Sequence, residues 1–323
     1  MLFMENGSKL LEELITCCKD KCRCNPIRGF SAKQVLEATN YFQSYCYSTD
    51  TYYKWYKGTM DDRPVLIKKY HLNDNNEAYR DIAISSQMSS QKNVLKLLGC
   101  CLEFSRPALV YEDAENGPLS NTGGIDFNSL SLSWNMRLKV AKEMAYTITY
   151  LHTAFTRPII HRNIKPTNIF LGKDYLPKLC DFSFSISIPE GETQVEDLVT
   201  AGTFGFVDPS YFTTTIITEH TDVYSFGVFL HVLLTGQCAI DFSRHEIEQN
   251  ICFYVANLVE KKQFKEIVDP KILEEEGGIS REKELQLQAF LSLALACTKE
   301  EREERPLMID VAKQLLKIER AAC

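Results

Sequence analysis

The stretch that decides the fold of this chain is His161-Arg162-Asn163-Ile164-Lys165-Pro166-Thr167-Asn168. It places two asparagines five residues apart in a short loop that also holds basic side chains. A carboxamide can orient a hydroxyl group and bind a metal ion, but it has no group that titrates near neutral pH and cannot accept a proton. The loop therefore offers polar ligands without offering a general base.

Further segments stand in a fixed order around this loop. Upstream, Val65-Leu66-Ile67-Lys68 is typical of a short buried strand that ends in a lysine. Downstream, a predicted hairpin with strands at 169–171 and 177–180 leads to Asp181-Phe182-Ser183, which begins 13 residues after Asn168. The remaining segments are residues 202–211, residues 222–228 and Arg305-Pro306-Leu307-Met308.

Taken together, these segments resemble the motifs of protein kinases over roughly residues 45–310. The resemblance implies an α+β, bilobal kinase-like domain at 43–318. Its small β-rich N-lobe is expected at about 43–115 and its larger helical C-lobe at about 116–318. Residues 1–42 are expected to form an N-terminal helical extension. The length of 323 residues suits one such domain with a short extension.

The resemblance assigns roles to the polar side chains of these motifs. Asn163 takes the position of the general-base aspartate, and the loss of a positioned base costs on the order of 10²–10⁴ in rate. Asn168 and Asp181 keep the positions of the Mg²⁺ ligands. Phosphoryl transfer is therefore expected to be impaired, while weak binding of ATP and Mg²⁺ stays open and no cofactor is required.

Lys68 takes the position of the lysine that binds phosphate in kinases. Its expected ion-pair partner is Asp81, on a helix predicted at Glu77–Met88, and Glu77 is the competing choice. Such a pair would serve nucleotide binding, or it would tie the helix to the sheet for structural reasons alone.

The glycine-rich turn that covers the phosphates in a kinase has no counterpart here. When Lys54-Trp55-Tyr56-Lys57-Gly58 is aligned with the end of that element, the three glycine positions are taken by Ser48, Asp50 and Tyr53. Asp50 would place a negative charge near phosphate oxygens, and Tyr53 would fill space at the roof of the site.

Residues 183–210 resemble an activation segment and are expected to act as a switch. The acidic side chains Glu190, Glu192, Glu196 and Asp197 favour an exposed, mobile loop. A phosphothreonine in the segment could pair with Arg162 and order it. The candidate switch residues are Ser183, Thr193, Thr200, Thr203 and Ser210.

Two departures from the kinase pattern lie at the ends of this segment. Ser183 replaces the glycine of the metal-binding triplet. Ser210 replaces a glutamate that in the family pairs with a late arginine, so Arg305 is expected to lack its usual partner.

The N-terminal residues predict two helices. Leu10, Leu11, Leu14 and Ile15 would form one apolar face of the first helix, and Ser31 with Gln34 would form the capping box of the second. Both helices would pack on the small lobe, or the first would dock a partner.

Composition narrows the class of partner and the compartment. The net charge of −7 gives no basic surface for nucleic acid. Twelve cysteines without a signal peptide or a long apolar run favour reduced thiols in a cytoplasmic protein. S-acylation of the cluster Cys17, Cys18, Cys22 and Cys24, or binding to partners, would bring the chain to the plasma membrane.

Residues 30–42, 96–103 and 202–211 together resemble plant receptor-like cytoplasmic kinases. Residues 52–58, 150–155 and 182–191 resemble the ZED-related pseudokinases, the ZRK group. This resemblance implies an adaptor in plant innate immunity. Its partners would be a ZAR-type nucleotide-binding leucine-rich-repeat (NLR) receptor, bacterial effectors and receptor-like cytoplasmic kinases that effectors modify. The alternative is a slow serine/threonine kinase in which Asn163 orients the substrate while water or phosphate takes the proton.

Overall fold

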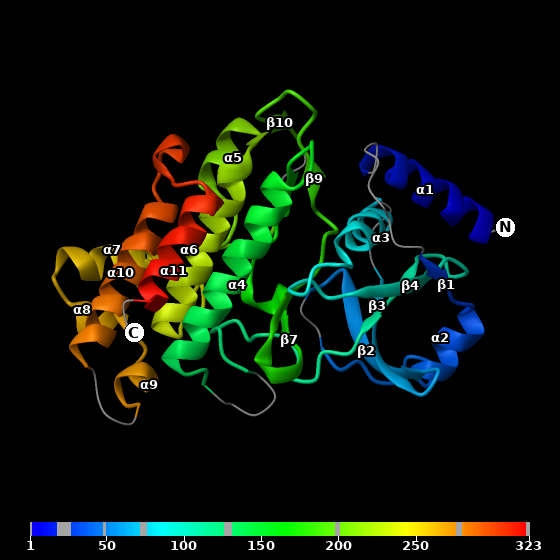
Figure 1. Cartoon of the computed structure of the whole chain (residues 1–323), viewed down its shortest axis with the longest axis horizontal. Helices are drawn as coiled ribbons and strands as arrows, with labels where there is room; N and C mark the ends of the chain where they lie inside the picture. The colour runs from blue at the N-terminus through cyan, green and yellow to red at the C-terminus, as the bar shows by residue number, and fades with distance from the viewer. Residues whose placement is uncertain are drawn as a thin grey trace. The chain divides into compact units, whose positions relative to one another are not determined.

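The computed structural model describes residues 2–17, 27–47, 50–71, 76–125, 131–197, 201–275 and 280–320. Ser48, Thr200, Cys18, Cys22 and Cys24 lie outside these ranges. The contacts divide the chain into two units, the first made of residues 1–118 and 170–185 and the second of residues 119–169 and 186–323. The first holds the large sheet and the second is mainly helical, which confirms the expected α+β fold (Figure 1).

A five-stranded sheet with the order β1-β4-β5-β3-β2 forms the first unit. All its pairings are antiparallel except that of β1 with β4. The turn between β2 and β3 is made by Asp61 and Asp62, both with positive φ, which suits the twist of a tight hairpin. The strands are β1 (Arg28–Gly29), β2 (Tyr53–Met60), β3 (Arg63–Tyr70), β4 (Leu97–Cys101) and β5 (Ala108–Glu112).

Three helices belong to the same unit: α1 (Leu2–Cys17), α2 (Ala32–Ala38) and α3 (Glu77–Met88). The bounds of α3 are those predicted, and the capping box of Ser31 and Gln34 on α2 is confirmed. The expectation that residues 1–42 are helical is incomplete, because β1 joins the sheet beside β4.

The predicted apolar face of α1 is only half correct. Asn6, Leu10 and Glu13 are buried, whereas Leu11 and Ile15 are 58% and 55% exposed. Residues 6, 10 and 13 share one stripe of a helix, and residues 11 and 15 lie on another face. The buried stripe is fixed by Asn6, whose amide donates to the backbone oxygens of Leu102 and Phe104.

The hairpin of β7 (Ile169–Leu171) and β8 (Pro177–Leu179) has the strands that the sequence predicts. We expected it in the helical lobe, but its contacts group residues 170–185 with the sheet. The reason is a pair of backbone hydrogen bonds, in which Leu95 donates to Leu179 and Leu179 donates to Asn93. This hairpin brings Asp181 to the first unit.

The second unit is organised around α6 (Glu219–Thr235), a helix buried along most of its length. It packs against α4, α7 and α10, and α11 packs against α4 (Figure 1). Within the described ranges, no helix combines the length and the apolar composition needed to cross a bilayer. The other helices are α4 (Trp134–Thr153), α5 (Pro209–Thr214), α7 (Ile251–Glu260), α8 (Phe264–Ile267), α9 (Pro270–Leu273), α10 (Arg281–Cys297) and α11 (Met308–Arg320).

Short strand pairs fix the loops of this unit. Strand β6 (Ile159–Ile160) pairs with β9 (Ile186–Ser187), and β10 (Val195–Glu196) pairs with β11 (Ile216–Ile217). Single 3-10 turns lie at Pro166–Asn168, Lys173–Tyr175, Glu246–Glu248 and Arg302–Glu304.

Candidate functional site

A buried lysine lies between two aspartates in the first unit. Lys68 on β3 is fully buried, with its Nζ 2.7 Å from Asp81 Oδ2 on α3 and 2.6 Å from Asp181 Oδ1. The expected ion pair is therefore present, and Asp81 rather than Glu77 supplies its carboxylate. Asp181 has a φ of +67°, a left-handed backbone conformation that is unusual for a residue other than glycine.

The carboxylate of Asp81 accepts further hydrogen bonds from the protein itself. Its Oδ2 accepts from the Tyr70 hydroxyl at 2.9 Å. Its Oδ1 accepts from the Ser85 hydroxyl at 3.0 Å, the Tyr111 hydroxyl at 3.2 Å and the Phe182 N–H at 3.1 Å. Since a carboxylate offers about four lone-pair sites, this group is saturated.

Asp181 is satisfied in the same way. The Tyr53 hydroxyl donates to its Oδ2 at 3.0 Å, and the Ser183 hydroxyl donates to its Oδ1 at 2.7 Å, beside Lys68. Tyr53 thus fills the site, as expected, and its ring centroid lies 3.8 Å from Lys68 Nζ. Ser183 acts as a donor to the carboxylate that it follows, a role the sequence did not predict.

Burial and charge set the protonation of this cluster. Burial lowers the pKa of Lys68, but the carboxylates of Asp181 and Asp81 outweigh it and hold that pKa above its ordinary value. Burial, reinforced by Asp81, raises the pKa of the Tyr70 and Tyr111 hydroxyls well above the usual range. Lys68 is therefore a cation and both tyrosines are neutral donors at physiological pH.

Trp55 also packs on the face of the sheet that carries Lys68, and the sequence analysis did not predict this role. It lies directly opposite Lys68 in the β2–β3 register and is fully buried. Its ring centroid lies 4.9 Å from that of Phe170 and 5.5 Å from that of Tyr111. The available signal was the aromatic alternation of residues 53 and 55, which places both side chains on one face of a strand.

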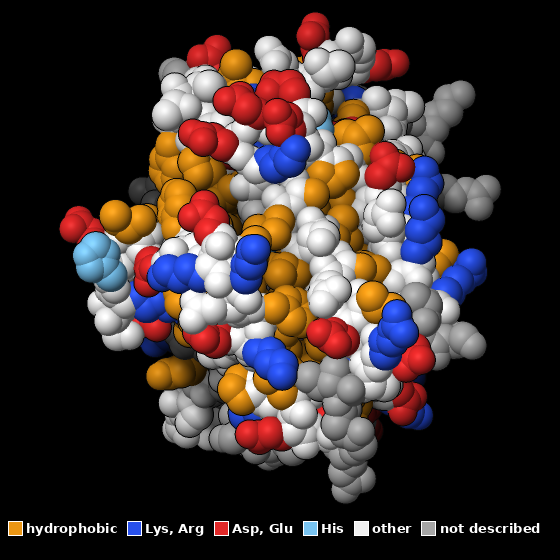
Figure 2. Space-filling view, turned by 90° about the vertical axis from the view of Figure 1, so that its left-hand side faces the viewer, with side chains coloured by type: hydrophobic (Ala, Val, Ile, Leu, Met, Phe, Trp, Pro, Cys, Tyr) orange, Lys and Arg blue, Asp and Glu red, His pale blue; other side chains and the backbone are white. Residues whose placement is uncertain are grey.

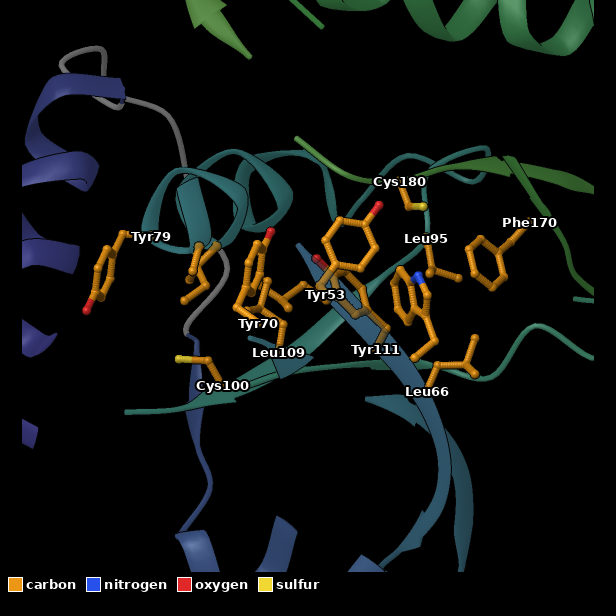
Figure 3. Packing of buried hydrophobic residues seen from close by; sticks show 14 of the residues in the cluster. Tyr53, Leu66, Tyr70, Tyr79, Leu95, Cys100, Leu109, Tyr111, Phe170 and Cys180 are labelled. Atoms are coloured by element: carbon orange, nitrogen blue, oxygen red, sulfur yellow. The ribbon is translucent and has the colours of Figure 1, made fainter. Parts of the chain in front are cut away.

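Figure 3 shows the result from close by. Tyr79, Tyr70, Tyr53 and Phe170 lie in a row along one face of the sheet, with Tyr111 beside them. In a kinase this is the face that carries the lysine toward the nucleotide phosphates. Here it is a packed aromatic core around an ionic centre.

Asp50 was predicted at another of the glycine positions. Asp50 lies in a turn before β2, where its Oδ1 accepts a hydrogen bond from the Tyr52 N–H at 3.1 Å. Ser48 is outside the described residues.

Asn163 and Asn168 lie together in the second unit. Both are buried, and the Asn168 amide donates to the backbone oxygen of Asn163 at 2.9 Å. The side-chain oxygen of Asn163 accepts a hydrogen bond from the Thr203 hydroxyl at 2.7 Å. The group at the base position is therefore engaged by the activation segment.

Asp222 on α6 holds the backbone of this loop. Its carboxylate accepts from the N–H groups of His161 and Arg162, both at 2.8 Å, and contacts His152 Nε2 at 2.9 Å. Burial opposes its ionisation, but the hydrogen bonds from His152 and His161 lower the pKa of Asp222 below its ordinary value. Asp222 fixes the loop conformation, in which Arg162 has a φ of +66°.

Arg305 lacks the glutamate that usually pairs with it, because Ser210 takes that position, but another carboxylate, that of Asp208, replaces it. Its Nη1 and Nη2 lie 2.6 and 3.0 Å from the two carboxylate oxygens of Asp208. Ser210 stands where the glutamate was expected, and its hydroxyl donates to Asp208 Oδ2 at 2.8 Å. A carboxylate two residues earlier therefore does the same structural work, and Ser210 supports it.

The prediction that the activation segment, residues 183–210, is an exposed, mobile loop is wrong in part. Residues 190–194, Thr193 among them, are exposed. Val195 and Glu196, however, form a strand that pairs with Ile217 and Ile216. The acidic composition suggested solvation, but the adjacent β-branched residues supply a strand partner.

Exposed apolar side chains gather elsewhere in the second unit. Phe204, Ile247 and Phe253 are 72%, 70% and 61% exposed and help to line a surface hollow of about 270 Å³. Figure 2 views the side where α7, α8 and α10 lie and shows hydrophobic side chains at the surface between charged ones. Patches of this kind mark interaction surfaces more often than chance.

The first prediction concerns Lys68. Replacing it with methionine leaves two buried carboxylates without their cation, so we expect Lys68→Met to lower the free energy of unfolding by about 3–5 kcal/mol. Urea denaturation measures this change. Lys96→Met, which alters an exposed lysine before β4, is the control and should stay within about 0.5 kcal/mol of the unaltered chain. Equal stability of the two variants would contradict a structural role for the ionic centre.

Comparison with known proteins identifies the family. A sequence model of the protein tyrosine and serine/threonine kinase family matches residues 47–315. Serine/threonine-protein kinase ZRK1 of Arabidopsis thaliana is 46% identical, over 98% of this chain and 92% of its own length. Non-functional pseudokinase ZED1 of the same plant is 48% identical, over 98% and 96%, and non-functional pseudokinase ZRK2 is 44% identical, over 98% and 89%. The chain therefore belongs to the protein kinase family and, within it, to the ZRK group that includes ZED1.

Proposed function

We propose that this chain is a catalytically impaired pseudokinase that acts as an adaptor in plant innate immunity. It would bridge an NLR receptor to bacterial effectors or to receptor-like cytoplasmic kinases that effectors have modified, in the cytoplasm. The observation that carries the first half of this proposal is the saturated cluster of Lys68, Asp81 and Asp181, which the protein fills with its own side chains.

The lysine and aspartate of the site are occupied by the protein's own side chains, and the general base is missing. A Mg²⁺ ion at Asp181 would have to displace the Tyr53 and Ser183 hydroxyls, and a phosphate at Lys68 would have to displace the ring of Tyr53. Asn163 cannot accept the substrate proton, and its side-chain oxygen already holds Thr203. These defects lie in independent parts of the catalytic apparatus, so their effects on the rate of phosphoryl transfer combine.

Several observations support a binding role. The relatives ZED1 and ZRK2 are named non-functional pseudokinases. The fold is retained, with internal ion pairs that rigidify it, and it exposes apolar side chains on α1 and around the hollow near Phe204. The identity of the receptor and effectors follows from the resemblance to the ZRK group alone.

The alternative is a slow serine/threonine kinase, and the name of ZRK1 favours it. Labelled phosphate transfer from ATP with Mg²⁺ or Mn²⁺ separates the two. We expect neither the unaltered chain nor Asn163→Asp to label itself or a substrate above an Asp181→Asn control, because a new base does not empty the filled site. Labelling by the unaltered chain would establish a kinase. Labelling by Asn163→Asp alone would show that the base is the only defect.

The adaptor half is tested by capture of a ZAR-type NLR receptor co-expressed with the chain. We expect the small lobe and the N-terminal helices to hold the receptor, so Leu11→Glu on the exposed face of α1 should reduce capture about tenfold or more. Leu285→Glu, an equally exposed leucine on α10, is the matched control and should capture normally. Capture by neither the unaltered chain nor the control would contradict the adaptor function. Equal capture by the unaltered chain, Leu11→Glu and Leu285→Glu would show that the receptor binds a surface other than the exposed face of α1.

A further inference from the structure

Arg162 is a buried arginine that already has an anionic partner. Its guanidinium is almost fully buried, and its Nη1 lies 2.8 Å from Asp197 Oδ2, on a side chain that is 26% exposed. Its Nη2 donates to the Tyr211 hydroxyl, and its Cζ lies 5.3 Å from the Tyr211 ring centroid. The pair joins residues 161–168, which correspond to the catalytic loop of kinases, to the activation segment, and Tyr211 belongs to helix α5.

The backbone of Arg162, in the loop of residues 161–168, is held by Asp222. Its backbone N–H donates to Asp222 Oδ1 at 2.8 Å, and its positive φ is held by that bond. Because Asp222 is fully buried on α6, the core of the unit fixes the backbone from which the guanidinium extends. The cation is thus preorganised for an anion at one place.

The segment presents Asp197 just as firmly. Its backbone N–H donates to the Thr215 oxygen at 3.0 Å, directly after the pairing of Val195 with Ile217 and of Glu196 with Ile216. The carboxylate therefore stands at the end of a strand, where the ladder fixes its position opposite Arg162.

We propose that Asp197 is a built-in replacement for a phosphate group and holds the activation segment against the catalytic loop without phosphorylation. In kinases that are switched by phosphorylation, a phosphate added to the segment pairs with arginine and orders it. Here the carboxylate of Asp197 pairs with Arg162 in the unphosphorylated chain.

Two consequences follow for the threonines of the segment. A phosphate on Thr193 or Thr203 would have to displace Asp197 before it could reach Arg162. A phosphate on Thr203 would also remove the hydroxyl that donates to Asn163 Oδ1. Phosphorylation is therefore expected to loosen the segment near Thr203 rather than to order it. The proposal concerns the isolated chain and does not depend on the adaptor function.

Hydrogen exchange with mass spectrometry tests this on phosphatase-treated chain whose intact mass shows no phosphate. We expect the amides of residues 195–197 and 215–217 to be protected in the unaltered chain. Asp197→Asn, which keeps the shape and removes the charge, should raise their exchange about tenfold or more. Glu192→Gln removes the same charge from an exposed turn of the same segment and should leave exchange unchanged.

Protection in α6 serves as the internal measure of folding and should be the same in all variants. If Asp197→Asn also loosens α6, Asp197→Glu decides the question, because it keeps the charge and is expected to retain protection in both regions. Three results would overturn the proposal: free exchange in the unphosphorylated, unaltered chain, protection in Asp197→Asn equal to that of the unaltered chain, or loss in Asp197→Glu as large as in Asp197→Asn.

Discussion

The first unit depends on one buried cation. Lys68 ties strand β3 to α3 through Asp81 and to the segment after β8 through Asp181. Removing three charges from water is costly, so the cluster is stable only because its geometry is close and its remaining lone pairs are satisfied. Hydroxyls of Tyr53, Tyr70, Tyr111, Ser85 and Ser183 satisfy them.

The same residues explain how a catalytic arrangement becomes a structural one. In an active kinase the lysine and the aspartate contribute their charges to nucleotide and metal. Here Tyr53, at one of the glycine positions, and the hydroxyls of Tyr70 and Tyr111 contact these groups, so their charges are satisfied inside the protein. The scaffold then keeps its shape without a bound ligand, as the proposed adaptor role requires. The second unit follows the same rule, with Asp222, Asp208 and Asp197 each holding a loop through charged hydrogen bonds.

Local patterns predicted much of this structure. The bounds of α3, the strands of the β7–β8 hairpin and the capping box of α2 could be read from local sequence patterns. The kinase resemblance gave Asp81 as the expected partner of Lys68, with Glu77 as the alternative, and the structure has Asp81. The filling of the site by Trp55, Tyr70 and Tyr111 could not be predicted, because aromatic residues in a strand are equally typical of an ordinary core. The partner of Arg305 was missed because the motif assigns a residue type to position 210, whereas Asp208, two residues earlier, reaches the arginine. The partner of Arg162 was missed because Asp197 was expected to lie in an exposed, mobile loop. In α1, apolar residues on more than one face made the buried stripe ambiguous until Asn6 fixed it.

The measurement that tests the central claim most directly is calorimetric titration of the unaltered chain with ATP and excess Mg²⁺. Since Asp181 and Lys68 are saturated by Tyr53, Ser183 and Asp81, we expect no saturable heat at millimolar nucleotide. Saturable binding with a dissociation constant below about 1 mM, lost in Asp181→Asn, would show that nucleotide displaces these side chains and would contradict the account.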